Sequence, residues 1–299
     1  MGRREIEYRV CDVFTEKPLE GNQLAVFLDA GGLSDEEMQS IAREMNLSET
    51  TFILRRDAAV ERERGVRVRI FTTREELPFA GHPSLGTAAT IREAYAEYRR
   101  EEKVVLDLIA GQVPVMFPAK QNTGNSCYGE MTQPEPVFGS YHEAAVIAPL
   151  MGLSEQDCGP RPQPQTVSTG LPYCIVPLRS VEALGRLRVD LAASAKYFQA
   201  SDAKFFYALA PEGVGVWRAR MQFYNGEDPA TGSAAGCAIA YMVRHGIAAA
   251  GERIHIRQGI EIRRPSDLYA SANSVSGKIT EVRLGGSTVH VAKGRLFLG

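Results

Sequence analysis

The sequence predicts an α+β protein of two similar domains, each a strand-rich, barrel-like sheet wrapped around one helix of small residues. Three observations support this fold class: a motif recurs half a chain later, two helical segments carry no charge, and many other apolar segments are typical of strands. Strand-rich halves that each enclose one helix favour this architecture over a doubly wound parallel sheet.

The recurring motif is P-x-x-G-[ST]-A-A. It occurs at residues 83–89 and again 146 residues later at 229–235. A weaker echo pairs 21–26 with 170–176, where a glycine opens an apolar segment in both cases. Chance similarity is the alternative, because glycine and alanine are common. The nearly equal offsets favour two halves of similar size, joined near 118–139, where Asn, Gly, Gln and Pro accumulate.

Several segments alternate or cluster β-branched and aromatic residues between glycines or prolines, and we predict strands there. They are Glu7–Phe14, Val66–Phe71, Val104–Leu108, Arg218–Tyr224, Ile254–Ile262 and Ser287–Leu298.

Three segments have helical patterns. Residues 34–37 form a capping box, and Met38, Ile41, Ala42 and Met45 follow at helical spacing until Asn46, so we expect a surface helix with one apolar stripe. Residues 85–91 and 232–242 have a different pattern from this surface helix. Both are rich in small residues and contain no charged side chain; Arg92 follows directly after the first. We therefore expect the strands of each domain to enclose its own helix.

Composition excludes several function classes. The chain has 299 residues, 34 Lys and Arg against 36 Asp and Glu, and a formal charge of −2, so we expect no nucleic-acid partner. No apolar run has the length of a membrane span, and the start MGRREIEYRV has no apolar signal core, so we expect no membrane partner and a cytoplasmic location. The 5 cysteines are scattered and suggest neither disulfides nor a zinc site.

Nucleotide-binding motifs are also missing from the sequence. Neither G-x-G-x-x-G after a strand nor G-x-x-x-x-G-K-[ST] occurs, so dinucleotide and P-loop functions lose their main support.

The openings of the two small-residue helices are candidate sites. His82 precedes Pro83 and Asp228 precedes Pro229, and a proline in the first helical position after a capping residue is a helix-opening signature. The backbone N–H groups and the dipole at such an opening suit an anion, such as a small carboxylate. Each side chain has a purely structural alternative as a cap or bridge. Two equivalent openings related by a pseudo-twofold axis would present both side chains to one ligand.

Glu49 is a third candidate, between the surface helix and an apolar strand. A surface acid or a cap is the alternative, whereas a position in a cleft against Leu47 and Phe52 would suit it to proton transfer. Cys237 lies inside the second small-residue helix, and we interpret it as core. A metal site of Glu49, His82 and Asp228 is a weaker alternative, since it has one imidazole and no ligand spacing.

At these residues the sequence resembles the PhzF-like family, the phenazine-biosynthesis isomerase group. The motifs GHP-x-x-G and EDPATGSA occur together in the family's order, and the Asn-x-Ser-Glu-Thr segment precedes both. The resemblance spreads over residues 12–269, in the runs DVFTEKPLEGNQLAVF, LSDEEMQSIAREMNLSETTFI, FTTREELPFAGHPSLGTA, EDPATGSAAG and QGIEIRRPSDLY.

The resemblance implies the diaminopimelate epimerase-like fold with its active site between two domains. We accordingly place an N-terminal domain at 1–126, completed by a C-terminal strand at 288–299, and a second domain at 127–287. It also implies an isomerase without metal or cofactor that moves a proton on a small carboxylate, and a homodimer.

The roles of individual residues are likewise implied by the resemblance. Glu49 would carry the proton and His82 and Asp228 would assist, and the backbone at Gly81, Gly232 and Ser233 would bind the substrate carboxylate. The epimerase relatives use a cysteine in each half at the motifs occupied here by Gly81-His82 and Asp228-Pro229. Neither motif holds a cysteine in this chain, which disfavours racemisation by two thiols.

Two departures limit the transfer from the family: the first bears on the substrate end of the cleft, and the second is chemically mild. Residues 221–226 look shorter than the usual loop, and Ser84 replaces the commoner threonine in GHP-x-x-G. Two other functions stay open beside the isomerase: an epimerase or racemase that uses Glu49 and Asp228 as opposed bases, and a metabolite-binding protein without turnover.

Overall fold

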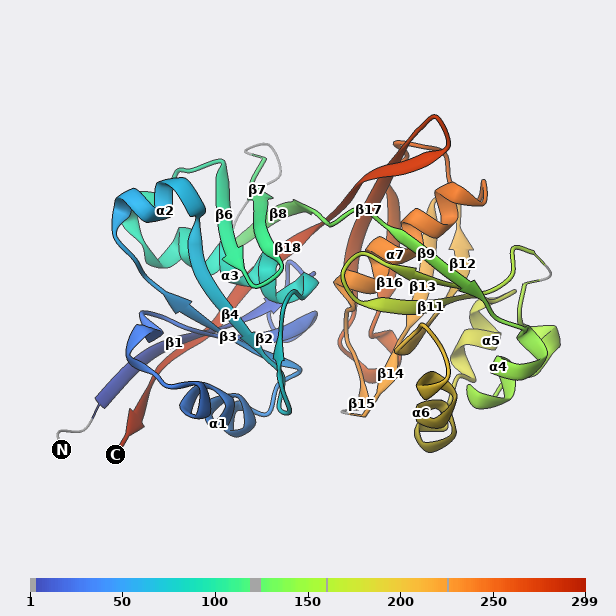
Figure 1. Ribbon diagram of the computed structural model, residues 1–299, viewed down its shortest axis with the longest axis horizontal. Coiled ribbons are helices and arrows are strands. Elements are labelled where there is room, and N and C mark those ends of the chain that lie inside the picture. The colour runs from blue at the N-terminus through green and yellow to red at the C-terminus, as the bar shows by residue number, and fades with distance from the viewer. Residues whose placement is uncertain (1–3, 119–124, 160, 225) are drawn as a thin grey trace. The chain divides into compact units, whose positions relative to one another are not determined.

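The chain divides into two compact units, as a computed structural model describes them for residues 4–118, 125–159, 161–224 and 226–299 (Figure 1). Unit 1 comprises Met1–Thr132 and Gly285–Gly299, and unit 2 comprises Gln133–Leu284. The sequence predicts these boundaries at 126/127 and 287/288. Residues 119–124, which belong to the predicted junction, lie outside the described residues.

Unit 1 is built mainly from strands. They are β1 (Arg4–Val13), β2 (Asn22–Phe27), β3 (Glu49–Leu54), β4 (Val66–Phe71), β5 (Glu76–Leu77), β6 (Lys103–Leu108), β7 (Gly111–Met116) and β8 (Ser126–Thr132). Its helices are η1 (Ala30–Gly32), α1 (Asp35–Met45), α2 (Ala58–Arg64), α3 (Gly81–Ala94) and η2 (Ala96–Tyr98). The last strand of the chain, β18 (Lys278–Leu298), begins in unit 2 and ends in unit 1.

Unit 2 has a similar content. Its strands are β9 (Val137–Tyr141), β10 (Gln165–Ser168), β11 (Pro172–Pro177), β12 (Phe205–Gly213), β13 (Val216–Arg220), β14 (Gln222–Phe223), β15 (Gly226–Glu227), β16 (Ile254–Gln258) and β17 (Ser266–Val275). Its helices are α4 (Ala144–Leu150), η4 (Glu155–Asp157), α5 (Val181–Gly185), α6 (Leu191–Gln199), α7 (Gly232–Arg244) and η5 (Ile260–Ile262). Among the described residues, no helix is both long and apolar enough to cross a membrane.

The sheet of unit 1 closes into a barrel. Its strand order is β1-β2-β3-β4-β6-β7-β8, and β18 pairs with both β8 and β1. Inside it lies α3, which contacts β1, β2, β3, β6, β7 and β8 and is buried from Gly81 to Ile91. The surface helix α1 packs its Met38 and Ile41 against a separate cluster that includes Phe27 and Phe52. The prediction of an enclosed helix is confirmed for this unit.

Unit 2 encloses α7 in the same manner. Its strands follow the order β9-β10-β11-β12-β13-β16-β17-β18, and α7 contacts β10, β11 and β17 (Figure 1). All residues from Gly232 to Met242 are buried. Cys237 is among them, which confirms its interpretation as a core residue, and burial raises the pKa of its thiol to about 12. The two units together confirm the mixed α+β class with barrel-like sheets.

The order of pairing types is the same in both units. From β1 to β7 the neighbours pair antiparallel, parallel, antiparallel, parallel and antiparallel. From β10 to β17 they pair in that same succession. In each unit the enclosed helix lies in the connection between the two strands of the second parallel pair, which are β4 and β6 in unit 1 and β13 and β16 in unit 2.

Small residues allow the enclosed helices to approach their sheets closely. A Cβ on Gly86 of α3 would lie 2.7 Å from Leu24 Cδ2 and 2.8 Å from Val13 Cγ2. A Cβ on Gly236 of α7 would lie 1.9 Å from Gln133 Oε1. Larger side chains at these positions would push the helices, which carry His82 and Ser233, away from the strands around them.

The surface helix agrees with its sequence pattern in detail. Ser34 caps α1 and forms the expected capping box with Glu37, and Asn46 ends the helix in a left-handed conformation with φ 50°. Both signals are local, because they depend on residues within one turn of each end.

The predicted openings of the enclosed helices were wrong in detail. Ala80 is the N-cap of α3, so His82 and Pro83 already lie inside its first turn. A proline is tolerated there because first-turn N–H groups have no partner within the helix. Thr231 is the N-cap of α7, and Asp228 lies three residues before it. Neither His82 nor Asp228 therefore caps a helix.

Two predicted strands were too long. The segment 218–224 is divided between β13 and β14, which belong to different sheets, because the Asp228 N–H donates to the Met221 carbonyl and turns the chain there. The segment 254–262 stops as a strand at Gln258. Gly259 follows with φ 75°, and a Cβ there would lie 2.3 Å from the Arg264 carbonyl oxygen, so the chain turns into η5. In contrast, β18 begins nine residues before the predicted Ser287.

Candidate active site residues in the two units

In unit 1 the barrel brings Glu49 and His82 together. Glu49 is the first residue of β3 and pairs with Leu24 of the parallel strand β2, against which Gly86 of α3 packs. This close approach places His82, in the first turn of α3, beside the start of β3. His82 Nε2 lies 3.5 Å from Glu49 Oε2, and the side chains are 4% and 18% exposed.

His82 is held in its neutral form. Burial lowers its pKa from 6.5 to about 3, and a backbone hydrogen bond with Gln23 offsets this shift only in part. The Nδ1 atom lies 3.3 Å from the Asn22 side-chain nitrogen. The Nε2 atom, which faces Glu49, is buried and has no hydrogen-bond partner among the described residues. A neutral imidazole carries one proton and one lone pair, so it can support a neighbouring carboxyl group in either protonation state.

In unit 2 the segment before α7 holds Asp228 in a fixed orientation. The Asp228 carboxylate accepts a hydrogen bond from Thr231 Oγ1 at 2.7 Å, and its backbone N–H donates to Met221 O at 2.9 Å. Asp228 is 8% exposed. Both contacts are local, and they restrain the side chain and the backbone of the same residue.

Gln258, the last residue of β16, braces this segment from the core. It is fully buried, and its Nε2 donates to the Asp228 carbonyl at 2.8 Å and to Thr231 Oγ1 at 2.9 Å. Its Oε1 accepts from the Thr231 N–H and from Tyr207 Oη, both at 3.1 Å. All donors and acceptors of the Gln258 amide are thus used. Burial, and to a lesser degree the Asp228 charge, raises the pKa of Tyr207.

A buried ion pair anchors the other end of the segment. Arg220 Nε and Nη2 bind the two carboxylate oxygens of Glu227 at 2.7 and 2.6 Å. Arg220 Nη1 donates to the carbonyl of Leu184 at 2.9 Å. Bidentate geometry and additional acceptors are what a buried ion pair needs to offset the loss of hydration. Glu227 is therefore a rigid neighbour for Asp228.

The predicted carboxylate-binding residues lie at the helix starts. Gly232 and Ser233 open α7, and Gly81 opens α3. First-turn N–H groups lack acceptors within their own helix and lie at its positive end, which suits an anion. The Ser233 hydroxyl also contacts Tyr173 Oη at 2.8 Å. Gly232 is held through its carbonyl, which accepts from Gln133 Nε2 at 2.9 Å.

The structure thus groups the predicted residues by unit. Glu49, His82 and Gly81 belong to unit 1, and Asp228, Gly232 and Ser233 belong to unit 2. Their action on one shared ligand stays a prediction.

Sequence reasoning missed three groups around these residues: Asn22, Gln258 and the Arg220–Glu227 pair. Asn22 and Gln258 lie in runs that support the family resemblance, but their contacts span 60 and 30 residues along the chain. No local pattern predicts contacts over such distances.

Comparison with known proteins identifies the family. The sequence profile described as "Phenazine biosynthesis-like protein" matches residues 11–294. A trans-2,3-dihydro-3-hydroxyanthranilate isomerase from Pseudomonas aeruginosa is 37% identical over 295 residues, which cover 97% of this chain and 99% of the relative.

Solved structures agree with this result. A predicted epimerase from Pseudomonas aeruginosa has a TM-score of 0.85 at 36% identity, covering 98% of this chain and 100% of the other. A hydroxyproline epimerase from Agrobacterium vitis, at 12% identity and 99% and 93% coverage, has a TM-score of 0.68 and shares the fold. The chain belongs to the phenazine biosynthesis-like (PhzC–PhzF) family and is an isomerase of that family.

Proposed function

We propose that this isomerase moves a proton between two carbon atoms of a small cyclic carboxylate, with Glu49 as the single acid and base. The observation that carries the proposal is the 3.5 Å approach of Glu49 to an imidazole that stays neutral at physiological pH. A cationic histidine would hold Glu49 in its ionised form, whereas a neutral one leaves the carboxyl group able to gain and lose a proton.

Glu49 alone removes the proton from the substrate and returns it. Its carboxylate takes a proton from one ring carbon. The electron pair of the broken C–H bond forms a new double bond, and the electrons of the old double bond form a C–H bond at another carbon with the proton that the Glu49 carboxylic acid returns. His82 supports both protonation states of Glu49, and Asp228 orients the substrate. The N–H groups of Gly81, Gly232 and Ser233 bind the substrate carboxylate.

The identity of the substrate class rests on the relatives. The Pseudomonas aeruginosa relative is a trans-2,3-dihydro-3-hydroxyanthranilate isomerase, and we propose a ring carboxylate of that kind for this chain. The proposal requires that Glu49, His82 and Asp228 act on the same bound molecule. The identical succession of strand pairings in the two units supports two related halves, as a pseudo-twofold arrangement requires.

Deuterium exchange tests the role of Glu49. We expect the wild-type enzyme to incorporate deuterium from deuterium oxide into a C–H position of trans-2,3-dihydro-3-hydroxyanthranilate, detected by mass spectrometry. Glu49→Gln, which is nearly isosteric, should lower exchange by about 10²–10⁴-fold without changing the melting temperature much. Glu44→Gln, at an exposed glutamate of α1, is the matched control. Full exchange by Glu49→Gln would refute the role.

Stereochemistry of the product separates the second candidate. Because one solved relative is described as a predicted epimerase, a product inverted at a single carbon is the alternative outcome. In that case Glu49 and Asp228 would act as opposed bases, and Asp228→Asn would abolish exchange from one substrate face only. A shifted double bond supports the isomerisation. We also propose a homodimer, which sedimentation equilibrium tests by the mass of the particle.

A further inference from the structure

The two units differ in the side chain that opens one corresponding barrel strand. Counted along the order of pairings that the units share, β12 takes the place of β3. Glu49 opens β3 and pairs with Leu24 of β2. Phe205 opens β12 and pairs with Tyr173 of β11. The weaker sequence echo aligns the same two partners, Leu24 and Tyr173. Phe205 therefore occupies in unit 2 the position that the carboxyl group of Glu49 has in unit 1.

Phe205 lies on the face of β12 that is turned toward the opening of α7. The next residue, Phe206, faces α6, where its ring lies 4.6 Å from that of Phe198. The residue after it, Tyr207, bonds to the Gln258 amide that braces the segment before α7. Because successive side chains of a strand point to opposite faces, Phe205 shares the face of Tyr207.

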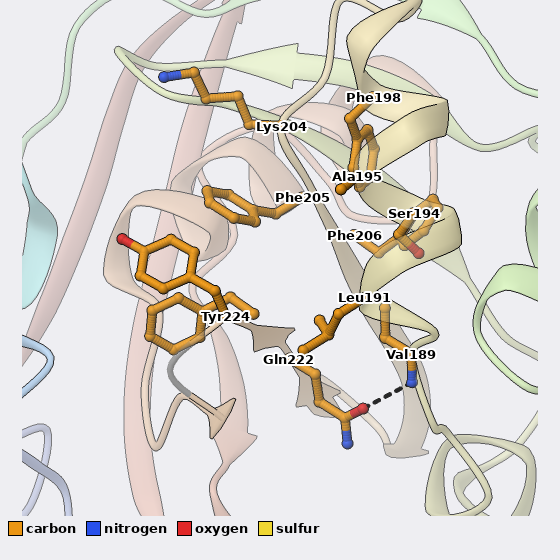
Figure 2. Close-up of a pocket in the computed structure, with 11 residues that line it drawn as sticks. Val189, Leu191, Ser194, Ala195, Phe198, Lys204, Phe205, Phe206, Gln222 and Tyr224 are labelled. Atoms are coloured by element: carbon orange, nitrogen blue, oxygen red, sulfur yellow. Dashed lines mark hydrogen bonds between the residues drawn. The ribbon is translucent and has the colours of Figure 1, made fainter. Parts of the chain in front are cut away.

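Phe205 belongs to a cluster of half-buried aromatic rings. Its ring meets that of Phe223 edge to face at a centroid distance of 6.3 Å and lies 6.5 Å from that of Tyr224. The rings of Phe223 and Tyr224 are 5.0 Å apart. All three residues line one pocket, and Figure 2 shows Phe205 and Tyr224 on its side away from α6. Rings that stay partly exposed together form an apolar surface that a ligand can cover.

Tyr173 connects this cluster with the predicted carboxylate-binding residues. Its ring lies 6.1 Å from that of Phe205, and its hydroxyl contacts Ser233 Oγ at 2.8 Å. Ser233 and Gly232 open α7, and their N–H groups are the proposed anchor for the substrate carboxylate. A ring carboxylate needs an anion site and an apolar surface side by side, because its carboxylate is attached directly to its ring.

We propose that Phe205 is a substrate-binding residue: with Phe223 and Tyr224 it forms the wall against which the substrate ring packs, and it selects ring carboxylates over open-chain ones. The inference rests on the proposed function in one respect, the carboxylate bound at Gly232 and Ser233. Aromatic side chains suit this task, because edge-to-face or offset contacts with a second ring add about twofold to tenfold in affinity beyond the area that they bury.

Corresponding positions of the two units then have different tasks. The start of β3 supplies the acid and base, Glu49, and the start of β12 supplies apolar surface, Phe205. A phenyl ring cannot take up a proton, so at this strand position unit 2 adds no second base to the reaction.

Two carboxylate probes of equal charge test the ring preference. We expect NMR shift titration of the full chain to give benzoate a Kd of about 1 mM and propionate a Kd about tenfold higher. Phe205→Leu should weaken benzoate binding about fivefold and leave propionate unchanged, because only benzoate has a ring to pack. Phe205→Tyr keeps the ring and should restore the benzoate Kd to within about twofold of the wild type.

Kinetics separate a binding role from a merely structural one. In Phe205→Leu, the KM for deuterium exchange of trans-2,3-dihydro-3-hydroxyanthranilate should rise about fivefold, whereas kcat should change less than about twofold. Phe198→Leu is the matched control, because Phe198 is also half-buried but packs on the α6 face of β12. It should change neither KM nor the benzoate Kd.

Three results would overturn the proposal. They are a wild type that does not bind benzoate more tightly than propionate, a Phe205→Leu variant with the wild-type benzoate Kd, and a Phe198→Leu variant that weakens benzoate as much as Phe205→Leu does. If Phe205→Leu changes the oligomeric state but not the Kd, the rings instead belong to a contact with a second copy. A wild type that prefers benzoate but exchanges no deuterium would refute the proposed reaction and support the ring wall.

Discussion

The two units hold their candidate site residues in different ways. In unit 1, His82 contacts Asn22 through one nitrogen, while the other nitrogen faces Glu49 at 3.5 Å and has no hydrogen bond within the described part of the chain. In unit 2, Thr231 binds the Asp228 carboxylate, and the Gln258 amide holds both residues through three of its four hydrogen bonds.

This difference fits the roles that we propose, with proton transfer at Glu49 and orientation of the substrate by Asp228. A carboxyl group that gains and loses a proton needs neighbours that tolerate both states, and a neutral imidazole with an open position provides this. A group that only orients a substrate gains from being fixed, because misplacement by about 1 Å can cost about 10² in rate. We therefore expect variants to affect the two units differently.

The largest effect should come from Gln258→Leu in unit 2. It leaves the buried Tyr207 hydroxyl and the Thr231 N–H without acceptors, at about 1–3 kcal/mol each, so we expect about 4 kcal/mol lower unfolding free energy. Deuterium exchange should fall about 100-fold as Asp228 loses its orientation. Gln165→Leu is the control, a buried glutamine bound to Gly139 and His245. Equal exchange in the two variants would contradict a bracing role for Gln258.

The next effect concerns the neutral His82 of unit 1. Its pKa is about 3 in the folded state against an ordinary 6.5, so the unfolded chain takes up the proton first as the pH falls. Stability from this group is complete above pH 6.5 and is lost progressively toward pH 3. Between pH 7 and pH 4, the unfolding free energy of the wild type, measured with urea, should fall by on the order of 3 kcal/mol more than that of His82→Asn. Parallel pH curves for the two proteins would show that His82 is not held neutral.

The enclosed helices offer a sharper version of the comparison. In Gly236→Ala the new Cβ meets the Gln133 amide, which binds the Gly232 carbonyl and the Thr169 hydroxyl, so a polar network must break. In Gly86→Ala it meets the side-chain ends of Leu24 and Val13, so no hydrogen bond has to break. We expect the unfolding free energy, measured by thermal unfolding, to fall by about 2 kcal/mol in Gly236→Ala and by about 1 kcal/mol in Gly86→Ala. The reverse order would mean that the barrel of unit 1 is the less adaptable packing.

The smallest effect should come from Asn22→Leu. One buried hydrogen bond to His82 is removed, with a net loss of about 1 kcal/mol in stability and about fivefold in exchange rate. Thr51→Val is the matched variant, because it removes the 2.8 Å hydrogen bond between Thr51 and Thr87 in the same barrel. It should lose similar stability and keep its exchange rate. Equal exchange losses would indicate that Asn22 acts only through the stability of the barrel.

Local signals predicted most of the elements. The capping box of α1, the uncharged segments 85–91 of α3 and 232–242 of α7, and the alternation of β4 and β6 each depend on residues close in sequence. The errors fell where contacts with residues outside the strand itself decide. The ends of β13 and β16 depend on a hydrogen bond from Asp228 to Met221 and on a backbone approach at Gly259, neither of which a period of two can report.

The sequence by itself determined the family and the α+β class and singled out Glu49, His82 and Asp228 as candidate site residues, because motifs and periodicity are properties of neighbouring residues. Tertiary structure alone decided that His82 is neutral, that Glu49 lies beside it and that Gln258 braces Asp228. Burial and long-range hydrogen bonds set protonation and orientation, and both arise only when segments distant along the chain pack against one another.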